Sequence, residues 1–275
     1  MTLQPRGRIY DNILQTMGNT PLVRFPRITD GVPADLCYKL EFFNPIASVK
    51  DRIGIAMIEA LEAEGKLKPG GTIVEPTSGN TGIGIAFAAA AKGYKAILVM
   101  PEQMSIERRK MMKLLGAELV LTEAAGGIPG AMAKADEICA ATPGAVQAGQ
   151  FVNPANPAIH EQTTGPEIWQ DTNGEVDIII SGVGTGGTIS GISRHIKNTC
   201  GKAITAVAVE PASSTIITAA KSGEAPTHAP HKIQGIGAGF LPSNLDLDLV
   251  DQVEQVSNEE AMTWAHKLMK QEGIL

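Results

Sequence analysis

Residues 44–52 read NPIASVKDR and place one lysine, Lys50, at the start of a predicted helix. Ser48 is a favourable N-cap, and Asp51, three residues later, completes the pattern of a capping box. Apolar residues then recur at helical spacing from residue 53 to residue 61. Because the helix macrodipole disfavours a cation in the first turn, Lys50 loses its proton there at lower cost. A neutral amine is what a Schiff-base lysine requires; the alternative is an ordinary solvated lysine on an amphipathic helix.

Outward from this helix, short strands alternate with helices along the chain. The predicted strands are 22–25, 35–41, 72–75, 96–100, 119–122, 176–180 and 203–210, and the predicted helices are 11–17, 49–65, 83–91, 105–115, 129–141, 160–172, 189–198 and 258–272. Apolar strands that alternate with helices are typical of parallel sheets covered by helices. We therefore predict an α/β protein with two open, mostly parallel sheets, helices on both faces, and an active-site cleft between two domains.

Composition and charge exclude several classes of protein. The formal net charge of −6 argues against a general binder of nucleic acid or of anionic membranes. Cys37, Cys139 and Cys200 are odd in number and lack metal-ligand spacing, so we predict neither a disulfide framework nor a metal site. The N-terminal residues lack an apolar signal-peptide core, and the longest apolar run, residues 83–91, is too short to span a membrane. These features predict a cytoplasmic protein.

The segment GTGGT (Gly184–Thr188) follows a buried-type strand and opens a helix. Backbone amides in such a loop can converge on an oxyanion, assisted by the helix dipole and by the two threonine hydroxyls. We interpret it as a phosphate-binding loop; the alternative is a close-packed turn without a ligand.

A second strand-to-helix loop, SGNTG (Ser78–Gly82), combines hydroxyls, a carboxamide and free amides. This combination suits a small carboxylate, such as that of an amino acid, at a helix N-terminus. Asn80 could also donate a hydrogen bond to a ring oxygen beside Lys50. The alternative is that Ser78 or Asn80 only caps the alanine-rich helix that follows.

A competing hypothesis concerns a dinucleotide site. Gly182, Gly184 and Gly187 satisfy the G-x-G-x-x-G pattern after a strand, and Glu210 ends the next strand, where a ribose-binding acid belongs. An NAD-dependent oxidoreductase is therefore an alternative. It explains neither Lys50 nor the SGNTG loop, and such a fingerprint usually lies in the first strand–helix unit of its domain.

A lysine able to form an imine, a phosphate loop and a carboxylate loop are together what a pyridoxal-phosphate enzyme needs. The sequence resembles the fold-type II, or tryptophan-synthase-β-like, pyridoxal-phosphate enzymes, and within them the cysteine synthases (O-acetylserine sulfhydrylases). The resemblance covers nearly the whole chain. The motifs that carry it, in order, are NPIASVKDR, EPTSGNTG, PEQMSIERR, NPANP with TTGPEIW, GTGGT and GIGAGF.

The resemblance implies roles for individual residues. Lys50 resembles the lysine that holds pyridoxal 5'-phosphate covalently and acts as the general base, and Asn80 matches the asparagine bonded to its 3′-oxygen. The phosphate-loop positions are Gly184, Thr185, Gly186, Gly187 and Thr188. The substrate-carboxylate positions are Thr77, Ser78, Gly79, Thr81 and Gln150. Gly235 lies in a loop that the family implies helps to shape the active site.

The implied reaction is replacement of the acetoxy group of O-acetyl-L-serine by sulfide, giving L-cysteine and acetate. A homodimer and binding of the C-terminal tail of serine acetyltransferase are implied by the resemblance only. Cystathionine β-synthase and serine or threonine dehydratase share the fold and stay as alternatives, and O-phosphoserine stays open as a substrate.

The resemblance also implies domain boundaries. We expect a smaller domain over residues 45–153, which carries the SGNTG loop, and a larger domain over residues 1–44 and 154–275, which carries the phosphate loop. The family continues beyond a segment like residues 271–275 into a loop whose serine bonds the pyridine nitrogen. We therefore expect either that the larger domain is truncated or that the cofactor's nitrogen meets water or another group. In both cases we expect the 275-residue form to bind the cofactor weakly, turn over poorly and be less stable.

Overall fold

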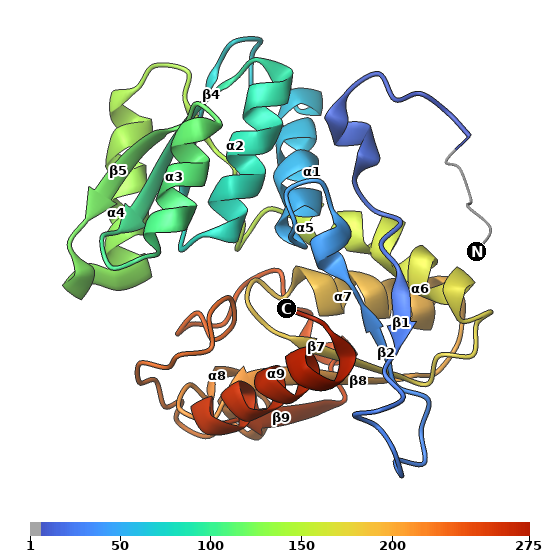
Figure 1. Cartoon of the computed structure of the whole chain (residues 1–275). Helices are drawn as coiled ribbons and strands as arrows, with labels where there is room; N and C mark the ends of the chain where they lie inside the picture. Colours follow the sequence, from blue (N-terminus) through green and yellow to red (C-terminus); the bar gives the residue numbers. More distant parts are fainter. Residues whose placement is uncertain (1–6) are drawn as a thin grey trace.

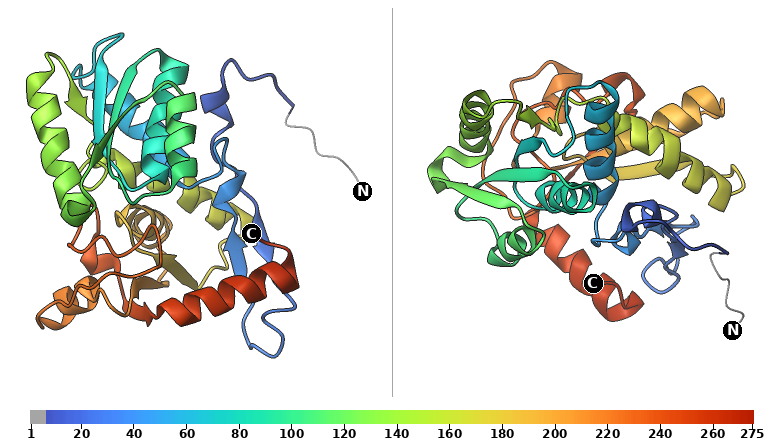
Figure 2. Two further views of the ribbon diagram at one scale, coloured as in Figure 1. Left: turned by 60° about the vertical axis from the view of Figure 1, so that its left-hand side comes forward. Right: turned by 90° about the horizontal axis from the view of Figure 1, so that it is seen from above.

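The computed structural model describes residues 7–275 and contains two parallel sheets and one small antiparallel pair. The first parallel sheet has the order β5-β4-β3-β6, the second has the order β7-β8-β9, and β1 pairs with β2. In Figure 1 the two parallel sheets lie one above the other, with α5 and α7 at their junction, and Figure 2 shows the arrangement from two further sides. The predicted α/β class with two open parallel sheets is confirmed.

The elements have the following bounds. The strands are β1 (Leu22–Arg24), β2 (Cys37–Lys39), β3 (Thr72–Pro76), β4 (Lys95–Pro101), β5 (Glu118–Thr122), β6 (Val146–Gln147), β7 (Ile178–Gly182), β8 (Thr205–Pro211) and β9 (Gln252–Val256). The α-helices are α1 (Lys50–Ala63), α2 (Asn80–Lys92), α3 (Ile106–Leu114), α4 (Gly127–Ala141), α5 (Ala155–Ile159), α6 (Gly165–Asp171), α7 (Gly187–Ser193), α8 (Ile216–Ser222) and α9 (Asn258–Glu272). Shorter turns are the 3-10 helices η1 (Ile13–Thr16), η2 (Glu41–Phe43), η3 (Ala124–Gly126) and η6 (Leu247–Leu249), and the π-helical turns η4 (His160–Thr164) and η5 (Arg194–Thr199).

The sequence patterns predicted most of these elements but missed β6, α8 and β9. The strand β6 is only two residues long, and β9 has the mostly polar sequence QVEQV with no fully buried residue. In place of the helix predicted over residues 160–172, the structure has one continuous helical segment over residues 155–171. In this segment the π-helical turn η4 joins α5 to α6. Residues 1–6 of the predicted polar arm lie outside the described part of the chain.

The first sheet is covered on both faces because its strands alternate between two cores. Ile73 and Leu98 pack into the cluster formed with α1 and α2, whereas Val74 and Val99 pack into a second cluster with α4. This is the strand period of two, with apolar residues on both faces of a buried parallel sheet. The interface between α1 and α2 therefore rests on a rigid, fully buried layer.

The second sheet is covered most thoroughly on the face that carries α7 and α8. Ala206 and Ala208 pack there with Ile189 of α7 and Ile217 of α8. On the edge strand β7, Ile178 and Ile180 are more than half exposed.

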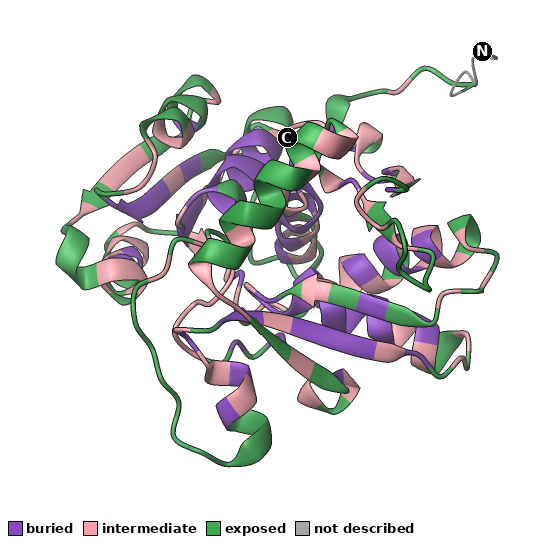
Figure 3. Cartoon of the chain, turned by 60° about the horizontal axis from the view of Figure 1, so that its bottom comes forward, coloured by how far each residue is buried: buried purple, intermediate pink, exposed green. Residues whose placement is uncertain are grey.

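Helix α9 crosses this region of the molecule with no buried residue, and its ribbon is green and pink in Figure 3. It begins with a full capping box between Ser257 and Glu260. Its last turn is fixed by Glu272, whose carboxylate accepts hydrogen bonds from the backbone amides of Arg27 and Ile28 at 2.8 and 2.7 Å. No helix within residues 7–275 is long and apolar enough to cross a membrane.

Candidate active site

Lys50 begins α1, as predicted. The capping box predicted between Ser48 and Asp51 is wrong, because their side chains bond to other backbone amides than a capping box requires. The Ser48 hydroxyl accepts the hydrogen bond from Lys50 N at 3.1 Å and donates to Asp51 Oδ1 at 3.1 Å. The other oxygen, Asp51 Oδ2, accepts from Ile46 N at 2.7 Å rather than from the backbone of Ser48. The reason is the left-handed backbone of Ala47, with φ of 59°, which turns the Ile46 amide toward the helix.

The Lys50 side chain is half-buried, and within residues 7–275 its Nζ has neither a hydrogen bond nor an ion pair. Burial lowers the pKa of Lys50, opposed by the charge of Glu41. Both properties favour a neutral amine with a free lone pair. Its backbone is held by α2: a Cβ on Gly84 would lie 2.5 Å from the Lys50 carbonyl oxygen, so the two helices touch backbone to backbone.

The loop after β3 folds around two threonines. The buried hydroxyl of Thr77 accepts hydrogen bonds from Gly79 N at 3.1 Å and Gly82 N at 3.0 Å, which closes the loop onto itself. Thr81 donates to Gln150 Oε1 at 2.7 Å, and Gln150 Nε2 donates to the carbonyl of Pro76 at 2.9 Å. The structure thus brings the predicted carboxylate contacts together, including Gln150 from far along the chain.

Gly79 occupies the N-cap position of α2 and has no side chain to cap it, and the Thr77 hydroxyl accepts from the first-turn amide of Gly82 instead. The alternative that Ser78 or Asn80 serves only as a cap is therefore not what the structure shows. Asn80 is exposed at the start of the helix. Sequence patterns did not single out Arg108 of α3, whose guanidinium lies so close to Gly79 that a Cβ there would be 2.8 Å from Nη1. The neighbouring cation and the positive end of the α2 dipole both favour an anion.

The predicted phosphate loop lies between β7 and α7 and is packed so that its glycines are required. Gly186 has φ of 82°, and a Cβ on it would lie 2.5 Å from the Leu245 side chain. A Cβ on Gly187 would lie 1.9 Å from Asn156 Oδ1, and one on Gly184 would lie 2.3 Å from the carbonyl oxygen of Gly235. Gly235 therefore contacts the loop directly.

Helix α7 also lacks a side-chain cap among the described residues. Thr188 Oγ1 lies 3.2 Å from His160 Nε2, and His160 Nδ1 lies 2.9 Å from Thr164 Oγ1. Burial, followed by the positive charges of Arg52 and Lys50, lowers the pKa of His160 well below its usual value. His160 is thus neutral, and Lys50 is near enough to act on it electrostatically.

Asn156 joins the two loops and was missed by the sequence analysis. It is fully buried, and its Nδ2 donates to the Gln150 carbonyl at 2.8 Å and to Thr185 Oγ1 at 2.9 Å. Asn244 donates to the same Gln150 carbonyl at 2.9 Å. The only sequence signal was that Asn156 belongs to the NPANP segment between the two halves of the chain.

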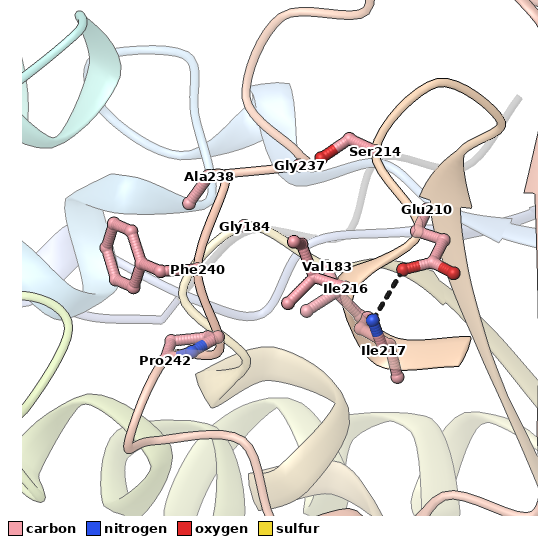
Figure 4. Close-up of a pocket in the computed structure, with 10 residues that line it drawn as sticks. All are labelled: Val183, Gly184, Glu210, Ser214, Ile216, Ile217, Gly237, Ala238, Phe240 and Pro242. Atoms are coloured by element: carbon pink, nitrogen blue, oxygen red, sulfur yellow. Dashed lines mark hydrogen bonds between the residues drawn. The ribbon is translucent and has the colours of Figure 1, made fainter. Parts of the chain in front are cut away.

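The geometry does not favour the dinucleotide hypothesis. Glu210 is buried, and its carboxylate accepts a hydrogen bond from Ile217 N at 2.7 Å (Figure 4). It also accepts one from Thr218 N at 3.1 Å, so it caps α8. Buried and bonded to α8, it is not presented to a ribose. The small cavity beside it adjoins Gly184 and Phe240 and contains none of the residues at the N-termini of α1 and α2.

Comparison with known proteins assigns the class that this fold and site suggest. The family described as "Pyridoxal-phosphate dependent enzyme" matches residues 13–275, and the chain belongs to this family. The chain is 57% identical over 271 residues to cysteine synthase A of Salmonella typhi, covering 98% of this chain and 83% of that protein.

Two solved structures from Entamoeba histolytica have the same fold. A cysteine synthase (OASS) matches with a TM-score of 0.92 and 43% identity, covering 100% of this chain and 80% of that one. An O-acetylserine sulfhydrylase isoform 3 matches with a TM-score of 0.91 and 45% identity, covering 100% of this chain and 81% of that one. The chain is therefore similar to cysteine synthases throughout its length.

The residues present fit pyridoxal phosphate. The Lys50 amine, without a partner among residues 7–275, supplies an imine-forming group. The glycine loop at residues 184–188 and the N-terminus of α2, each with a glycine at the N-cap position of its helix, supply two anion sites. The enzyme is pyridoxal-phosphate dependent.

Proposed function

We propose that the protein is a cysteine synthase, which replaces the acetoxy group of O-acetyl-L-serine by sulfide and releases L-cysteine and acetate. The similarity to cysteine synthases over 98% of the chain supports the reaction. The structural observation that carries the proposal is the unpartnered Lys50 amine beside two anion loops that Asn156 joins.

In this proposal Lys50 moves the proton. Its lowered pKa favours the neutral amine, which can take the substrate's α-proton and return it to the product. Bound pyridoxal phosphate supplies the electron sink for that proton loss. The backbone contact with Gly84 fixes the main chain of Lys50, from which the side-chain amine extends toward the site.

The other site residues bind and orient. Amides of Gly184–Thr188 and the Thr185 and Thr188 hydroxyls would hold the cofactor phosphate, and Asn80 would hold its 3′-oxygen. The substrate carboxylate would lie against the N-terminus of α2 and be bound by residues already gathered there. These are Thr77, Ser78, Gly79, Thr81 and Gln150, with Gly235 closing the phosphate side.

The wider organisation belongs to the same proposal. Residues 45–153 would form a smaller domain that closes over the bound carboxylate, and residues 1–44 with 154–275 the larger one, so that closure excludes water from the reacting atoms. The protein would act in the cytoplasm as a homodimer, with a serine acetyltransferase tail as a possible occupant of the site.

The test is turnover with defined substrates. Purified protein loaded with pyridoxal phosphate should form cysteine from O-acetyl-L-serine and sulfide. Lys50→Ala should abolish this activity, and Lys66→Ala, which removes an exposed lysine paired with Glu64 beyond the end of α1, should not. Pyruvate released from serine without a nucleophile, or cystathionine formed from serine and homocysteine, as the faster reaction would replace the proposal with a dehydratase or a cystathionine β-synthase.

A further inference from the structure

Glu75 is a fully buried carboxylate that the proposed chemistry does not use. It is the penultimate residue of β3 and is 0% exposed. Its Oε2 accepts a hydrogen bond from Gly149 N at 2.8 Å, and its Oε1 accepts one from Gln150 N at 3.1 Å. One carboxylate thus holds two successive backbone amides that lie 74 and 75 residues further along the chain.

Those amides fix Gln150, whose other polar atoms are also engaged. The side chain accepts from Thr81 and donates to the Pro76 carbonyl, and the backbone carbonyl accepts from Asn156 and Asn244. The position of Gln150 beside the N-terminus of α2 therefore depends on Glu75 on one side and on the two asparagines on the other.

We infer that Glu75 is a proton-controlled positioning residue for the substrate-carboxylate subsite: ionised, it holds the Gly149–Gln150 backbone in place, and protonated, it releases one of the two amides. This rests on the proposed function. An ionised carboxylate accepts strongly at both oxygens, whereas protonation makes one oxygen a hydroxyl, which accepts from an amide N–H only weakly and carries a proton that needs an acceptor of its own. Release would move Gln150 away from Thr81 and weaken binding of the substrate carboxylate.

The surroundings of Glu75 place its protonation within the physiological pH range. Burial raises the pKa of Glu75 to about 7, against the opposing effect of its two backbone hydrogen bonds and of the Gln150 side chain. The titratable groups on the elements packed against β3 are Lys92 of α2, Lys95 of β4, and Lys134, Asp136, Glu137 and Cys139 of α4. Within the described chain none of them contributes to the shift, so desolvation alone drives it.

The chain contains an internal comparison. Both β3 and β8 end in Val-Glu-Pro, and Glu210 of β8 is likewise buried and accepts from two successive backbone amides. The amides that Glu210 holds begin α8 and do not contact Gln150. Glu210→Gln is therefore the matched control, since it makes the same chemical change at the equivalent strand end.

The experiment measures KM for O-acetyl-L-serine and kcat from pH 5.5 to pH 8.5 in the cofactor-loaded wild type, Glu75→Gln and Glu210→Gln. Loss of one charged hydrogen bond at the positioning site should raise the wild-type KM by about tenfold between pH 8 and pH 6, with a midpoint near 7. Glu75→Gln, which mimics the protonated form, should have the raised KM at every pH and a smaller change in kcat. Glu210→Gln should keep the inflection.

A measurement on the wild type keeps the inference testable if Glu75→Gln does not fold. The amide proton resonances of Gly149 and Gln150 should move together with a midpoint near pH 7 because their common acceptor titrates. Amides that do not titrate between pH 6 and pH 8 would overturn the inference, as would a Glu75→Gln variant with the wild-type KM and inflection. Failure of the wild type to form cysteine at any pH would instead remove the proposed function on which the inference rests.

Discussion

The contact between Gly84 and Lys50 gives a sharp prediction about what positions the catalytic amine. Replacing Gly84 by alanine would put its Cβ 2.5 Å from the Lys50 carbonyl oxygen and 3.0 Å from the carbonyl carbon. Ordinary contact begins near 3.4 Å, so the first turn of α1 must move by about 0.9 Å, and the neighbour is backbone that cannot rotate aside.

Two magnitudes follow from this displacement. A shift of about 1 Å at a reacting group costs on the order of 100-fold in rate, so kcat/KM of Gly84→Ala should fall by about that factor. Overpacking costs about 1–3 kcal/mol, and better helix propensity returns about 1 kcal/mol, so the net loss of stability should be at most about 2 kcal/mol.

The assay compares kcat/KM, cofactor absorbance and thermal midpoint in Gly84→Ala and Gly130→Ala. Gly130 is a matched helical glycine in α4 with nothing within 4 Å of its Cβ position, so its alanine variant should gain about 0.5 kcal/mol and keep full activity. If Gly84→Ala matched the wild type in kcat/KM, the idea that the backbone contact sets the position of Lys50 would be refuted.

Three further predictions concern the ion pairs and the phosphate loop. Arg52→Met should lower the free energy of unfolding by about 3 kcal/mol in a denaturant titration, because it leaves the carboxylates of Glu41 and Glu167 without their buried guanidinium. Burial would raise the pKa of Glu167, but the hydrogen bonds and charge of Arg52 lower it to about 2. Stability from that pair should therefore be complete above about pH 4.5 and be lost as the pH falls toward 2, and Arg52→Met should show a smaller loss over that range; equal losses would contradict the pairing. Gly186→Ala, at φ of 82° and against Leu245, should weaken cofactor binding by at least about tenfold in an absorbance titration, whereas unchanged binding would remove this loop from the phosphate site.

The local units of the fold could be predicted from sequence because each carries its own signal. Strand, loop and helix follow one another within about 20 residues in both the SGNTG and GTGGT units, and the apolar runs and glycines mark their borders. The start of α1 at Lys50 was visible for the same reason. Strand β9 was not visible, because its pairing with β8 rather than its polar sequence makes it a strand.

The residues that assemble the site were harder to predict because their partners are distant. Asn156, His160 and Glu75 act through contacts 6 to 75 residues away, and no spacing pattern encodes those contacts. The π-helical turn η4, which points His160 at Thr188, likewise has no periodicity of its own. The one overlooked local signal was the repeated Val-Glu-Pro at the ends of β3 and β8.

The proposed reaction depends most directly on Lys50 as the residue that binds the cofactor. Borohydride reduction of the protein loaded with pyridoxal phosphate, followed by peptide mass mapping, locates the lysine that has reacted. We expect the adduct on the peptide that contains Lys50, at one per chain, and no adduct at that stoichiometry in Lys50→Ala. An adduct on a different lysine in protein that forms cysteine, or active protein with no adduct at all, would contradict the account.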